Sequence, residues 1–140
     1  MKRFTAWLVL TAALTAHIAD EAVTGFLDLY NPTVRAMRER HPWLLLPTFT
    51  FPLWIALLAL AVIGLLILSY WVRRGTWWTR YAADAYALLM LSNGLAHLIF
   101  SVYKHAWMPG AYTSPLLLAA AAFLLRADRP PTASYPARRP

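Results

Sequence analysis

The chain of 140 residues contains no cysteine, which excludes disulfide bonds, thiolate metal ligands and cysteine nucleophiles. Charge is also scarce, since Asp, Glu, Lys and Arg make up 14% of the chain and only six residues are acidic. The sequence has no nucleophile elbow, phosphate-binding loop, haem-attachment motif or evident internal repeat. Hydrophobic residues make up 60% of the chain, more than in an ordinary soluble domain. This combination is typical of an integral membrane protein.

The formal net charge of +7 would suit a nucleic-acid-binding protein, but the positions of the basic residues do not. Lys and Arg flank long apolar runs, where they set the orientation of spanning helices and meet anionic lipid headgroups. The sequence therefore predicts the lipid bilayer as a partner and no nucleic acid.

Four apolar stretches are interpreted as transmembrane helices, because about 20 mostly apolar residues cross a bilayer. They run from Phe4 to Leu27, from Pro52 to Val72, from Tyr81 to Tyr103 and from Ala111 to Leu125. The fourth is short and approaches spanning length only if it begins near Met108. The expected fold is thus an all-α polytopic membrane protein with four transmembrane helices.

The segments outside these stretches have their own predicted structure. Residues 31–42, between the first two spans, read as a short interfacial helix on the outer side, with Asn31 as N-cap, Pro32 at the first helical position and Pro42 as its stop. We expect residues 1–126 to form one transmembrane domain. Residues 127–140 are rich in Pro and Arg and are expected to be a disordered cytoplasmic tail.

The distribution of basic residues predicts a multi-pass protein of the cell membrane with both termini in the cytoplasm. Nine basic residues fall on the predicted cytoplasmic side: Lys2, Arg3, Arg73, Arg74, Arg80, Arg126, Arg129, Arg138 and Arg139. Four fall on the other side: Arg35, Arg38, Arg40 and Lys104.

The first sixteen residues also have features of a signal peptide, with a basic start and an apolar stretch. Cleavage after Ala16 would make His17 the N-terminus. Leu14 is unsuited to the position three residues before that cut, and the helical pattern continues beyond it. We expect an uncleaved span.

Polar residues interrupt the first and third spans. His17, Asp20 and Glu21 are three and four residues apart, so they share one helix face, and Asn93 and His97 lie one turn apart in the third span. Both groups lie about 12–16 residues, or ~18–24 Å, from the cytoplasmic start of their helix. A charge facing lipid at this depth is costly, and intramembrane ionisable groups usually serve function. We expect the two groups to form one site toward the outer leaflet, although the same residues would also lock a helix bundle by hydrogen bonds.

The sequence His17-x-x-Asp20-Glu21, followed by Asn93-x-x-x-His97 and Pro109-Gly110-x-x-Thr113, resembles the HXXEE family of small multi-pass membrane proteins. The resemblance extends from the first helix to the start of the fourth. Asp20 stands where the family name implies Glu. The resemblance implies a membrane protein of uncharacterised activity and supplies no substrate.

Three kinds of chemistry fit these residues. In the first, His17, Glu21 and His97 bind a divalent metal such as Zn, Fe or Mn, and the remaining acid acts as an outer partner or general base. In the second, Asp20, Glu21 and Asn93 take part in metal-free acid–base catalysis, as in a lipid isomerase. In the third, the same acids bind a ligand or relay ions without catalysis. The leading hypothesis is the first, a metal-dependent enzyme acting on an apolar or lipid-like small molecule.

Overall fold

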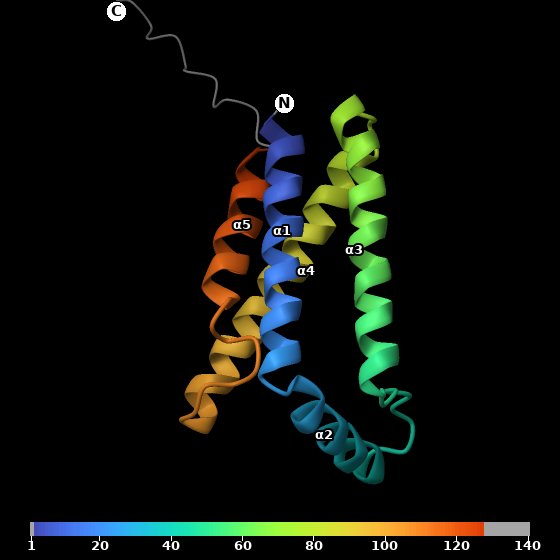
Figure 1. Cartoon of the computed structure of the whole chain (residues 1–140), viewed down its shortest axis with the longest axis vertical. Helices are drawn as coiled ribbons and strands as arrows, with labels where there is room; N and C mark the ends of the chain where they lie inside the picture. The colour runs from blue at the N-terminus through green and yellow to red at the C-terminus, as the bar shows by residue number, and fades with distance from the viewer. Residues whose placement is uncertain (1, 128–140) are drawn as a thin grey trace, which may run out of the picture.

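The computed structural model describes residues 2–127, which form five α-helices (Figure 1). The helices are α1 (Lys2–Val23), α2 (Phe26–Arg40), α3 (Phe51–Arg74), α4 (Thr79–Lys104) and α5 (Ser114–Ala127). The all-α prediction is confirmed. Of the predicted tail, residues 127–140, only Ala127 is described, and it is the last residue of α5.

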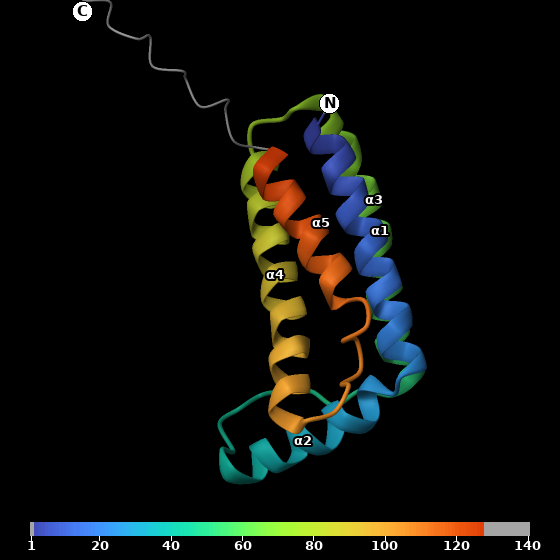
Figure 2. The ribbon, with the colours of Figure 1, turned by 90° about the vertical axis from the view of Figure 1, so that its left-hand side faces the viewer.

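Helices α1, α4 and α5 form the core of the molecule, and α3 packs along α1 (Figure 1). Figure 2 shows α5 between α4 and α1, with α2 crossing obliquely beneath them. The core between these helices contains many small side chains, which allow close approach of the backbones. At Gly94 an added Cβ would lie 3.1 Å from the Leu118 side chain and 3.3 Å from the Ser114 carbonyl oxygen. The absence of a side chain at Gly94 therefore permits close packing of α4 against α5.

Three helices, α1, α3 and α4, are long and apolar enough to span a membrane. The surface of α3 supports this reading, because large apolar side chains such as Leu60 and Ile67 are exposed over most of its length. One hydrogen bond joins α3 to α1: the indole Nε1 of Trp7 in α1 donates to the Leu65 carbonyl in α3 at 2.9 Å. Apolar helices of this kind indicate membrane residence.

The fourth apolar helix is shorter than a bilayer. Helix α5 begins at Ser114 and has 14 residues, which gives a length of ~21 Å against a hydrocarbon core of about 30 Å. The preceding residues do not extend it toward Met108. They turn instead, and the chain passes from exposed Trp107 to fully buried Ala111 before the helix starts.

The segment after the first span differs from the prediction. Helix α1 ends at Val23, because Gly25 adopts a left-handed conformation with φ of 78° and turns the chain into α2. Helix α2 then starts at Phe26, so Asn31 lies inside it and is no N-cap. The Asn31 amide instead pairs with the backbone of Phe49, donating to its carbonyl at 2.9 Å and accepting from its N–H at 3.0 Å. Pro32 also lies within the helix, where it lacks the backbone N–H that other residues donate to the carbonyl four residues earlier.

The start of α1, the end of α3 and the end of α5 lie at one end of the molecule, and α2 lies at the other (Figure 1). The basic residues of the predicted cytoplasmic side that the structure describes therefore gather at one end. Residues before Ala16 contribute Ala6, Trp7 and Leu10 to the core, each at most 1% exposed. Cleavage after Ala16 would remove them from the core.

Candidate metal centre

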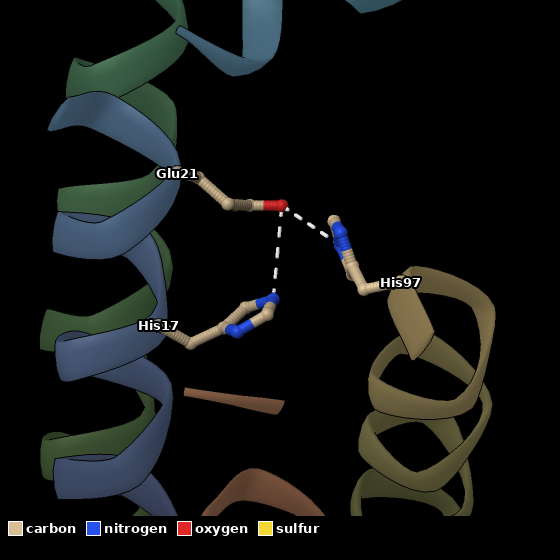
Figure 3. Close-up of side chains that lie close together, drawn as sticks. All are labelled: His17, Glu21 and His97. Carbon is tan, nitrogen blue, oxygen red and sulfur yellow. Dashed lines mark ion pairs between the residues drawn. The ribbon is translucent and has the colours of Figure 1, made fainter. Parts of the chain in front are cut away.

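Three side chains from two helices meet near the end of α5 that faces α2 (Figure 3). Helix α1 presents His17 and Glu21 on one face, because residues four apart are neighbours on a helix. Helix α4 presents His97 from the opposite side. The side chains of His17, Glu21 and His97 are only 1%, 9% and 10% exposed.

The spacing of these side chains suits a metal ion. Glu21 Oε1 lies 3.1 Å from His97 Nε2 and 3.7 Å from His17 Nε2. The ligand atoms of all three residues lie within 4.8 Å of one another. In a tetrahedral site with ligands 2.0–2.1 Å from zinc, neighbouring ligand atoms are about 3.3 Å apart. The cluster could therefore hold a metal ion after small side-chain shifts.

Asp20 contacts the start of α5 and does not point into the cluster. Its Oδ2 accepts hydrogen bonds from the Thr113 N–H at 3.0 Å and the Thr113 hydroxyl at 2.9 Å. A carboxylate accepts only, so the hydroxyl oxygen of Thr113 is left to accept from His17 Nδ1 at 3.0 Å. This chain of hydrogen bonds places the His17 proton on Nδ1 and leaves Nε2 with the lone pair that a metal needs.

Asn93 also acts on His17. Its side-chain Nδ2 donates to His17 Nε2 at 3.1 Å, which fits the same tautomer. The amide and a metal ion would compete for this lone pair. Asn93 therefore contacts the cluster through His17.

A tight loop fills the space between the two imidazoles. Gly110 has φ of 82°, and a Cβ added there would lie 2.9 Å from His17 Cε1 and 3.0 Å from His97 Cε1 and Nδ1. Only a residue without a side chain fits so close to both rings. The loop before α5 thus forms one wall of the site.

Helices α1 and α4, which carry the three side chains, pack against each other only in part. Helix α5 lies between them over much of their length (Figure 2). They meet directly beyond the start of α5, where Glu21 contacts His97, and again in the other half of the bundle, where the Trp7 and Tyr86 ring centroids are 5.0 Å apart. The side chains of His17, Glu21, Asn93 and His97 thus lie together.

Sequence reasoning gave no specific role to Thr113, Gly110 or Phe26. The Phe26 ring lies against His97, with centroids 6.1 Å apart, and stacks on Trp54 at 5.8 Å. The stretch Pro109-Gly110 followed by Thr113 belongs to the quoted motif, but its contacts with α1 depend on tertiary packing. The other two histidines, His41 and His105, are exposed and lie outside the cluster.

Comparison with known proteins gives no match, since the chain matches no protein-family model, no curated protein and no solved structure. The part of the quoted motif that forms the cluster is His17-x-x-x-Glu21 together with His97. The HXXEE family is not confirmed by these comparisons.

Proposed function

We propose that this protein is a membrane-embedded enzyme whose divalent metal centre is formed by His17, Glu21 and His97 and acts on an apolar or lipid-like molecule. The observation that carries this proposal is the convergence of two imidazole nitrogens and one carboxylate oxygen at metal-ligand spacing inside a bundle of apolar helices. Mixed nitrogen and oxygen ligands suit Zn²⁺, Fe²⁺ or Mn²⁺.

The surroundings of the ligands support the same proposal. Three protein ligands leave a coordination position open, which is the usual arrangement of catalytic rather than structural zinc. Asp20 and Thr113 orient His17, as outer hydrogen bonds do for metal-binding imidazoles. A metal held there would supply Lewis-acid chemistry. The carboxylate of Glu21 would balance the charge of the metal. Asp20 and Asn93 would hold the protons of the hydrogen bonds around His17.

Metal content of the purified protein tests this proposal. Wild-type protein in detergent, reloaded with Zn²⁺, Fe²⁺ or Mn²⁺, should retain about one equivalent of one of these ions by mass spectrometry. Glu21→Gln and His97→Ala should each lose the ion, because an amide cannot balance its charge and a missing imidazole opens its shell. His105→Ala is the matched control and should keep it. Wild-type protein that retains none of the three ions would end the metal proposal.

The contact between Glu21 and His97 supports a second candidate, metal-free acid–base catalysis on a lipid-like substrate. At 3.1 Å the carboxylate and imidazole are within hydrogen-bonding distance without any ion. Such a pair can pass a proton to and from a bound molecule. Stoichiometric metal in the wild type, lost in Glu21→Gln, would count against this candidate.

We also propose membership of the HXXEE family and a four-span topology with both termini cytoplasmic. The three segments of the motif are far apart in the chain but meet in space, through the hydrogen bonds of His17 with Thr113 and with Asn93. For the topology, α5 and the buried loop before it would together occupy the fourth crossing. Irregular backbone is tolerated at membrane depth where protein surrounds it.

A further inference from the structure

A groove of about 430 Å³ leads away from the candidate metal centre between α2 and α4. Asn93 and His97 line its inner part. It is therefore continuous with the site, and a molecule lying in it would touch a proposed metal ligand.

Most of the side chains that line this groove are apolar or aromatic, and one is a lysine. Leu29 of α2 and Ala96 and Phe100 of α4 give it apolar walls beyond the imidazole. Lys104 also lines the groove, seven residues after His97 on the same helix. Seven residues are two turns, so the ammonium group is carried on the same side of α4 about 10 Å farther along its axis.

The charge at Lys104 is not neutralised within the described chain. Its ammonium lies 5.7 Å from the centroid of the Tyr103 ring, and no ion pair in residues 2–127 joins it to a carboxylate. It is the last residue of α4, at the end of the molecule where α2 crosses. A cation at the rim of an apolar groove fits an anionic headgroup.

We propose that the groove between α2 and α4 binds a single-chain amphiphile with an anionic head, with the head at Lys104 and the chain passing Ala96 and Phe100 to His97. The inference rests on the proposed function, because it takes this amphiphile as the substrate of the metal centre. It places the reacting part of the molecule within its chain, about 10 Å from the head.

Photo-crosslinking in nanodiscs of phosphatidylcholine tests the proposal. The probe is a sixteen-carbon fatty acid with a diazirine in mid-chain, which is long enough to reach from Lys104 past His97. Its alcohol and amine analogues carry the same chain. Peptide mass spectrometry should locate the label of the fatty acid on Leu29, Ala96 or Phe100. Labelling of these positions by the alcohol and the amine should be lower by about fivefold or more, because both lack the negative charge that Lys104 attracts.

Two variants with matched controls sharpen the test. Lys104→Gln should lower labelling by the acid about fivefold, whereas Arg38→Gln, on α2 and outside the groove, should not. Ala96→Phe should block the groove, whereas Leu95→Phe introduces the same side chain at a position that is 48% exposed and does not line it. Equal labelling by acid, alcohol and amine, or labels confined to the exposed face of α3, would overturn the proposal.

Metal content measured on the same samples separates the two proposals. Lys104→Gln and Ala96→Phe should retain the ion of the wild type, because neither residue is a proposed ligand. If the wild type binds no metal but the labelling pattern holds, the metal centre is wrong and the lipid groove stands. If metal is bound but labelling depends neither on the charge of the head group nor on the Ala96→Phe substitution, the groove proposal is wrong and the metal centre stands.

Discussion

The lone pair of His17 Nε2 accepts a hydrogen bond from the Asn93 amide and would also bind the proposed metal. Substitutions of Asn93 and Asp20 should therefore change metal affinity in opposite directions. Asn93→Ala removes a competing donor, so metal affinity should rise up to about tenfold, the value of one ordinary hydrogen bond. Asp20→Asn weakens the hydrogen bonds that hold Thr113 and His17, so affinity should fall by about tenfold or more. Competition titrations with a chelating dye measure both. Loss of metal in Asn93→Ala would show that Asn93 is itself a ligand.

At the scale of the element, the loop before α5 is held by its contact with both imidazoles. Gly110→Ala should lower the melting temperature and reduce metal binding, because the new methyl group displaces both rings. Gly75→Ala is a matched control: Gly75 also has a left-handed conformation, with φ of 67°, but a Cβ there meets nothing within 4 Å. The control should lose only about 1–2 kcal/mol of backbone energy and keep its metal. Equal metal loss in both variants would contradict this role of the loop.

The same elements show how far the sequence predicts the fold. Helices α3 and α4 agree with their predicted spans to within a few residues, because a long apolar run is both a helix and a span by its composition. The predicted end of α1 and the predicted start of α2 were wrong. Residues 26 and 27 continue the apolar pattern, and nothing in periodicity alone shows that Gly25 turns the chain before them.

At the scale of the whole molecule, the ends of the helices divide the basic residues between two sides. We expect a green fluorescent protein fused after Pro140 to fluoresce, and alkaline phosphatase inserted near Arg38 to be active, since the more basic side stays in the cytoplasm. Phosphatase fused after Pro140 is the control and should be inactive. An active phosphatase at that position would place the C-terminus outside and contradict the four-span topology.

The sequence by itself determined the apolar helices and the helical spacing of His17 and Glu21, because both depend on residues close together in the chain. Only the tertiary structure decided where α5 begins, that Asp20 contacts Thr113, and that Gly110 lies between two imidazoles. The hydrogen bond that His17 donates to Thr113 joins residues 96 positions apart, and the one that it accepts from Asn93 joins residues 76 apart. Such contacts depend on the rotation and depth of each helix in the bundle. Those are fixed by packing of the small residues between α4 and α5, which no local pattern specifies.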